Sequence, residues 1–148
     1  MKSEFSALLV HTNHDAFETL NAALEELSVE PAHAWSLQHV ESSLCRIPPP
    51  HLVVTEPVFP EGNWWDVLDL AAKASEKVNV IVVSAVADIG LYVDVINHGG
   101  FDVIGHSLAT HDLVHVLRGA LEDAVRSRGA RKRGPYVFQE EPSGQLTP

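Results

Sequence analysis

A short apolar run at residues 52–55, Leu-Val-Val-Thr, constrains the fold more than any other part of the sequence. The run ends at Glu56, and Pro57 and Pro60 follow it. An apolar run without polar alternation is typical of a strand that is buried on both faces of a parallel sheet, and the prolines prevent the strand from continuing. Because functional groups collect beyond the carboxyl ends of the strands in such sheets, we expect Glu56 to lie at a functional site.

Strand-like and helix-like segments alternate five times along the chain. The predicted strands are residues 5–10, 32–37, 52–55, 78–84 and 101–105, and the predicted helices are residues 17–27, 40–47, 64–74, 88–98 and 110–124. Apolar residues recur at helical spacing in the first and last helical segments, and Asp88 with Gly99 and Gly100 bounds the fourth. This alternation predicts an α/β protein: a three-layer α/β/α sandwich around a doubly wound parallel sheet of five strands.

Charge is divided unevenly between a long acidic part and a short basic part. Residues 1–125 hold five Lys and Arg against eighteen Asp and Glu, whereas residues 126–148 hold five against two. An acidic body disfavours contact with nucleic-acid phosphates, so nucleic-acid binding is not expected. From residue 126 the sequence is rich in Gly, Pro and polar residues and has no regular period. We therefore predict one folded domain over residues 1–125 and a flexible tail, basic and then polar, over residues 126–148.

No segment resembles a membrane-spanning helix or a secretory signal. The most apolar run, residues 78–86, is much shorter than the roughly 20 residues that cross a bilayer. The N-terminus carries one lysine and then enters a predicted strand, without the small-residue pattern of a cleavage site. We therefore expect a cytoplasmic protein with no membrane partner.

Polar side chains follow four of the predicted strands. His11 and Thr12 come after the first strand, Glu56 after the third, Ser84 at the end of the fourth and His106 after the fifth. The carboxyl ends of parallel strands meet at one edge of the sheet, so we expect these side chains to converge there.

The segments that carry these residues resemble the receiver domain of two-component response regulators, over residues 5 to about 125. LLVHTNHD resembles the first-strand motif, PHLVVTEPVFPEGNWWDVL the phosphoacceptor segment, VIVVSA the strand that ends in a hydroxyl residue, and GGFDVIGHS the Gly-Ala-x-Asp-Tyr-x-x-Lys-Pro segment. The resemblance implies a flavodoxin-like fold with strand order 2-1-3-4-5. It also implies which position of the family each residue occupies. Glu56 stands at the phosphoacceptor position, His11 and Thr12 at the Mg²⁺-binding acidic pair, Ser84 and Val103 at the switch positions, and His106 at the position of the family's lysine.

The residues at these positions differ from those that the family's chemistry requires. Phosphoryl transfer to an aspartate needs a divalent cation held by oxygen ligands, and neither member of the acidic pair is present. Glu56 stands in place of the aspartate and is one methylene longer. Val103 stands in place of the switch aromatic and cannot make its inward movement. His106 stands in place of the lysine, which is a fixed cation. The sequence therefore predicts a degenerate receiver, or pseudo-receiver. Such an atypical response regulator would act as a phosphorylation-independent protein-interaction module, with no enzymatic activity and no cofactor.

Two alternatives concern the same residues. Glu56 could mimic a permanently phosphorylated aspartate, although a carboxylate carries less charge and fewer oxygens than a phosphoryl group. His11, Glu56 and His106 could instead form a two-histidine, one-carboxylate site for Zn²⁺ or Fe²⁺, which would make the chain a metal-binding regulator.

The resemblance also predicts where a partner protein binds. In receivers the fourth helix, the fifth strand and the fifth helix form the usual partner and dimer surface, which here corresponds to residues from Asp88 to about Arg126. We expect a signalling protein, or a second copy in a homodimer, to bind there. Trp64 and Trp65 are adjacent, so on a helix they point about 100° apart. One can pack while the other stays exposed as a binding anchor.

Overall fold

The computed structural model describes residues 5–12, 17–85 and 88–138, with side chains as far as residue 130. In this part of the chain, five parallel strands form one sheet in the order β2-β1-β3-β6-β7. These strands are β1 (Ala7–Val10), β2 (Ala32–Ala34), β3 (Leu52–Thr55), β6 (Asn79–Ser84) and β7 (Asp102–Gly105). Counted along the chain, their order is the predicted 2-1-3-4-5, so the flavodoxin-like fold is confirmed.

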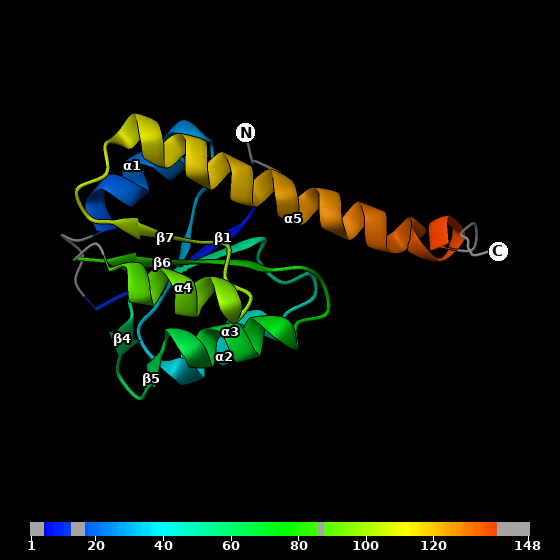
Figure 1. The fold of residues 1–148 in the computed structure, drawn as a ribbon, viewed down its shortest axis with the longest axis horizontal. Helices are drawn as coiled ribbons and strands as arrows, with labels where there is room; N and C mark the ends of the chain where they lie inside the picture. Colours follow the sequence, from blue (N-terminus) through cyan, green and yellow to red (C-terminus); the bar gives the residue numbers. More distant parts are fainter. Residues whose placement is uncertain (1–4, 13–16, 86–87, 139–148) are drawn as a thin grey trace.

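Helices cover both faces of the sheet (Figure 1). One face carries α1 (Glu18–Glu26) and α5 (Thr110–Phe138), and the other carries α2 (Leu37–Leu44), α3 (Trp64–Ala72) and α4 (Ile89–Asn97). The three-layer prediction is therefore confirmed. Among the helices described, none combines the length and the apolar character needed to cross a membrane.

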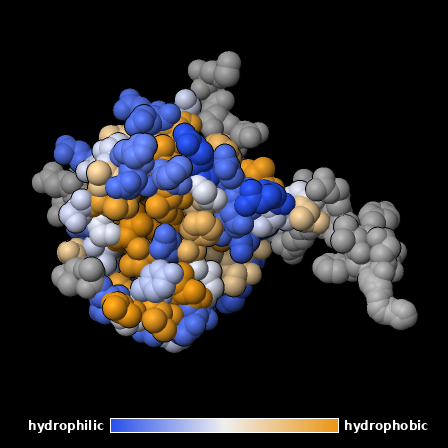
Figure 2. Space-filling model, turned by 45° about the horizontal axis from the view of Figure 1, so that its top comes forward, coloured by the Kyte–Doolittle hydropathy of each residue, from blue (hydrophilic) through white to orange (hydrophobic). Residues whose placement is uncertain are grey.

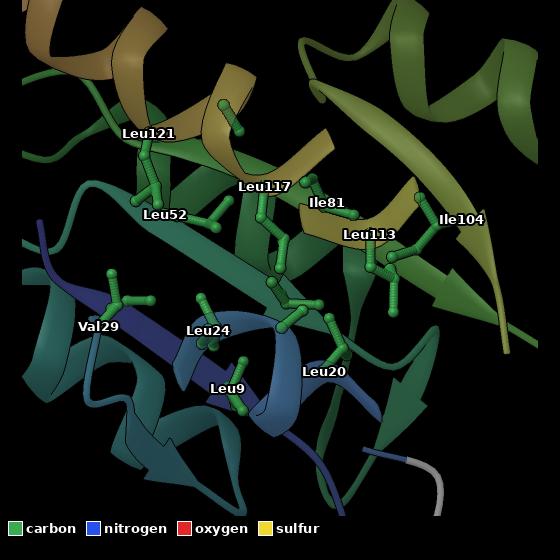
Figure 3. Close-up of a cluster of buried hydrophobic side chains, with 14 of the residues drawn as sticks. Leu9, Leu20, Leu24, Val29, Leu52, Ile81, Ile104, Leu113, Leu117 and Leu121 are labelled. Carbon is green, nitrogen blue, oxygen red and sulfur yellow. The ribbon is translucent and has the colours of Figure 1, made fainter. Parts of the chain in front are cut away.

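Successive residues of the central strands enter two separate hydrophobic cores. Leu9 and Leu52 belong to the core beneath α1 and α5, where Leu117 also lies (Figure 3). Leu8 and Val53 belong to the second core, which contains residues of α2 and α3. Because both faces of the sheet are covered, these strands need an apolar side chain at every position, and the sequence therefore contains unbroken apolar runs.

A small antiparallel hairpin, which the sequence did not predict, separates β3 from α3. Its strands are β4 (Val58–Phe59) and β5 (Gly62–Asn63). Gly62 lies so close to Phe59 that a Cβ would be 2.8 Å from a carbon of its ring. Asn63 caps α3. Its side-chain Oδ1 accepts hydrogen bonds from two backbone amides of the first turn, and its backbone amide donates to the Asp66 carboxylate. The hairpin thus fixes where the third helix begins.

Helix α5 continues to Phe138, well beyond the predicted end at residue 124, and projects past the edge at which the strands begin (Figure 1). Residues 126–138 are therefore helical, where an irregular tail was predicted. Alanine, arginine and lysine in this segment favour helix, and the preceding turns of α5 are already formed on the sheet. Residues 139–148 of the predicted tail lie outside the described residues.

The side chain of Arg128 attaches this extension to the rest of the domain. It is 8% exposed. Its Nε donates to the carbonyl of Lys77 at 2.9 Å, and its Nη2 donates to the carbonyls of Pro49 and Pro50 at 3.0 and 2.9 Å. Burial lowers the pKa of the Arg128 guanidinium, and the charge of Glu76 opposes this effect. The boundary predicted at residue 125 therefore falls within a continuous, anchored helix.

Candidate functional site

The predicted site residues come from one edge of the sheet, on the left of Figure 1. Val10 is paired with Thr55, and Thr55 with Val82, so β1, β3 and β6 approach this edge in register. The residues that immediately follow β1 and β3 are His11 and Glu56. Three of the predicted positions, His11, Thr12 and Glu56, therefore lie on neighbouring strand ends.

Glu56 and Thr12 are in direct contact. Oε1 of Glu56 accepts hydrogen bonds from the backbone amide of Thr12 at 3.0 Å and from its hydroxyl at 3.1 Å. The amide of Glu56 in turn donates to the carbonyl of Val10 at 3.0 Å. Glu56, the predicted phosphoacceptor position, is thus tied to Thr12, a predicted acidic-pair position, by two neutral donors.

His11 is completely buried, with an exposure of 0%. Its ring stacks on Phe17, with ring centroids 4.7 Å apart and an angle of 18° between the planes. Its Nε2 lies 2.9 Å from Nδ1 of His33, so one of these two nitrogens donates a hydrogen bond to the other. The imidazole of His11 therefore packs between α1 and β2 as part of the interior.

His33, the partner of His11, was not predicted from the sequence. The register pairs it with Leu9, two residues before His11 on the neighbouring strand. Side chains two residues apart share a face of the sheet, which brings the two imidazoles together. A lone histidine in Ala-His-Ala carries no signal of this contact until the pairing of β1 with β2 is known.

Of the remaining predicted positions, Ser84 ends β6, Val103 lies within β7 and His106 follows β7. Ser84 is half-buried and is paired with Gly105, and its carbonyl accepts the amide of His106 at 3.3 Å. Val103 is half-buried opposite Val82. The His106 side chain is exposed to solvent. The side chain at the lysine position thus lies on the surface.

The alternative metal site is not formed. Among the described residues, no three histidine, cysteine, aspartate or glutamate side chains lie where they could hold one metal ion. The reason lies in the opposite environments of the proposed ligands. His11 is turned into the interior against His33, while His106 is exposed, so these two and Glu56 do not converge.

The two adjacent tryptophans differ in burial, as expected. Trp64 is half-buried and packs against the core beneath α2 and α3. Trp65 is 47% exposed, and its ring centroid lies 3.8 Å from that of His98, at the end of α4. An exposed indole therefore stands between α3 and α4.

No protein-family model matches the chain, and no curated protein matches it. Solved receiver domains do match it. The signal receiver domain of a protein described as a Luxo repressor, from Vibrio parahaemolyticus, aligns with a TM-score of 0.73 and 18% identity over 93% of this chain and 98% of that one. The HemR receiver domain of Leptospira biflexa aligns with a TM-score of 0.67 and 21% identity over 80% of this chain and 94% of that one.

A third solved structure is the NtrC4 receiver domain dimer activated with beryllofluoride. It aligns with a TM-score of 0.71 and 21% identity, over 80% of this chain and 98% of that one. Together with the strand order and the helices on both faces, these likenesses establish that the chain has the fold of the response regulator receiver domains.

Proposed function

We propose that this chain is a degenerate receiver that binds a protein partner without being phosphorylated and that it is not an enzyme. The observation that carries the proposal is the contact of Thr12 with Glu56. A Mg²⁺ ion in a phosphorylation site needs several oxygen ligands, usually with carboxylates among them. Thr12 instead supplies hydrogen-bond donors, and these occupy an oxygen of the carboxylate that would have to accept the phosphoryl group.

The environment of His11 supports the same conclusion. Mg²⁺ is a hard cation that prefers oxygen to imidazole nitrogen. The Nε2 of His11 is engaged with His33 inside the protein. Without an oxygen ligand at this position, Mg²⁺ would bind weakly. The charge of a phosphoryl group would then not be neutralised during its transfer.

A structural role for Glu56 is better supported than mimicry of a phosphorylated residue. Its carboxylate links the ends of β1 and β3 through Thr12. A receiver reports phosphorylation through residues that change position, and here the switch aromatic is replaced by Val103, a half-buried valine within the sheet. Without the aromatic switch residue, a permanent mimic would lack a contact that changes between the two states and through which it could act.

The partner surface that we propose is formed by α4, β7 and the start of α5. Apolar side chains gather on this side of the molecule (Figure 2). Ile89, Tyr92 and Val93 of α4 are all exposed. Contiguous exposed apolar side chains are typical of interaction sites. A second copy of the chain is one occupant that this proposal allows, as the NtrC4 receiver domain forms a dimer.

Phosphorylation by a small-molecule donor tests the proposal. We would incubate the protein with acetyl phosphate and Mg²⁺ and measure its intact mass. A receiver domain that has the aspartate, the acidic pair and the lysine serves as the positive control. We expect the control to gain one phosphoryl group and this chain to gain none. A phosphoryl group on Glu56, lost in a Glu56→Gln variant, would overturn the proposal.

A further inference from the structure

Helix α4 carries apolar side chains that the fold leaves in solvent. Only Val95 of this helix is buried. Ile89 is 82% exposed, Tyr92 47% and Val93 45%. Together with the half-buried Ile96 they occupy positions i, i+3, i+4 and i+7, so they form one stripe along the helix, the α4 stripe. Apolar side chains at this spacing usually pack against another protein surface, and in the part of the chain that the structure describes Ile89, Tyr92 and Val93 stay exposed.

The α4 stripe lies in a part of the chain that has carboxylates but no fixed cations. The sequence contains no lysine or arginine between Lys77 and Arg118. The carboxylates in that stretch are Asp88, Asp94, Asp102 and Asp112. Asp88 caps α4, Asp94 is exposed on α4 itself, and Asp112 is exposed in the first turn of α5. With histidine counted as neutral, the stretch of chain that holds the stripe therefore has a net negative charge.

An exposed aromatic ring, Trp65, contacts His98, which lies one helical turn after Asp94. The Nδ1 of His98 lies 2.7 Å from the carbonyl oxygen of Asp94, and the His98 ring contacts Trp65. At about 100° per residue around the helix axis, Asp94 lies between Val93 of the stripe and His98. An arginine side chain can pair with a carboxylate and stack on an indole at the same time. Near the stripe, Asp94 supplies an exposed carboxylate and Trp65 an exposed indole.

A symmetric contact between two copies fits this surface poorly. In a two-fold dimer the same patch faces itself, so the carboxylates of one copy would meet those of the other with no lysine or arginine of this stretch between them. Like charges placed together cost several kcal/mol in such interfaces. The charge of the surface therefore favours a partner of opposite charge.

We infer that the α4 stripe, with Asp94 and Trp65 beside it, binds a segment of another protein that presents arginine or lysine next to apolar side chains at helical spacing. This inference rests on the proposed function, because it names the partner class of the same interaction surface. The apolar side chains of the segment cover the stripe, while its cations pair with the carboxylates and stack on Trp65.

A designed peptide pair tests the inference on the full chain. The probe is a helical peptide of about 18 residues, or five turns, with leucine along one face and arginine on both flanks. The comparison peptide carries glutamate in place of every arginine. The affinity of each peptide is measured by titration at low and at high salt. The NMR shifts of the backbone amides and of the indoles locate the binding site. We expect the arginine peptide to bind on α4, to lose affinity with salt, and to bind more tightly than the glutamate peptide.

Matched variants identify the contact. Asp94→Lys should weaken binding of the arginine peptide by about tenfold or more, because it places like charges together. Glu25→Lys changes the same charge on α1, across the sheet, and should leave the affinity unchanged within about twofold. Equal binding of both peptides, no binding of either, or shifts away from α4 would overturn the inference. So would a dimer, seen by light scattering, that excludes the peptide from α4.

The outcome is separable from that of the proposed function. If acetyl phosphate modifies Glu56, the proposed phosphorylation independence fails, whatever the peptide does. If the chain stays unmodified and the arginine peptide does not bind, the inference fails alone.

Discussion

The amide and the hydroxyl of Thr12 both donate to the same oxygen of Glu56, at 3.0 and 3.1 Å. This contact joins the ends of two neighbouring parallel strands at the edge where a phosphorylated receiver would hold its metal ion. The carboxylate therefore acts within the fold as a hydrogen-bond acceptor.

Removing the charge of Glu56 should weaken this link. In Glu56→Gln the two donors face a neutral oxygen, and a hydrogen bond to a charged group is worth more than one to a neutral group. Because the site is partly exposed to water, we expect a loss of about 1 kcal/mol in the free energy of unfolding, measured with urea. The control is Glu41→Gln, on the exposed side of α2. Equal stability of the two variants would show that the contact contributes nothing.

Restoring an aspartate at the first acidic-pair position should damage the fold. His11 is fully buried against Phe17, and a carboxylate there would be desolvated without a cation beside it. We expect His11→Asp to lower the free energy of unfolding by about 3 kcal/mol. His11→Phe keeps a stacked ring but loses the hydrogen bond with His33, so we expect a loss of about 1 kcal/mol. A His11→Asp variant as stable as His11→Phe would contradict the buried position.

Arg128 should contribute much more to stability than Arg126, two residues before it on the same helix. Arg128→Met leaves three backbone carbonyls without their donor, so we expect a loss of about 2 to 3 kcal/mol in urea unfolding. Arg126 is exposed and has a surface ion pair with Asp123 at 3.5 Å. For Arg126→Met we expect about 0.5 kcal/mol or less. Similar losses in both variants would contradict the anchoring role of Arg128.

Apolar residues of the core and of the α4 stripe should respond differently to truncation. Leu117 lies on the buried side of α5, in the core (Figure 3), so Leu117→Ala should lower the free energy of unfolding by about 3 kcal/mol. Ile89 lies on the solvent side of α4, so Ile89→Ala should change the free energy of unfolding by less than about 0.5 kcal/mol. A large loss for Ile89→Ala would mean that the stripe belongs to the core and cannot be a partner surface.

The fold could be predicted because its determinants are local. The apolar runs around Leu9 and Val54 report burial on both faces, and each predicted helix has its apolar residues at helical spacing. The extension of α5 could not be predicted in this way. Gly129, Gly134 and Pro135 in this segment disfavour helix, and the contact of Arg128 with the distant Pro49 and Pro50 carbonyls is not visible in a local pattern.

Part of the candidate site could be predicted because the ends of the strands are visible in the sequence. Thr12 and Glu56 were expected at one edge of the sheet because parallel strands end together, and the structure brings them into contact. The position of His11 depends on His33, which only the register of β1 with β2 places beside it. Burial of a side chain at a strand end is decided by packing against another strand, so the residue types alone did not separate His11 from His106.

The most direct test of the account is thermal unfolding with Mg²⁺ and beryllofluoride, which stands in for an aspartyl phosphate. A ligand that binds only the folded state must raise the unfolding midpoint. We predict no rise beyond that produced by Mg²⁺ or beryllofluoride alone, because Thr12 and His11 provide no carboxylates for the metal ion. A rise that needs both components together, and that is lost in Glu56→Gln, would show a working phosphate site and contradict the account.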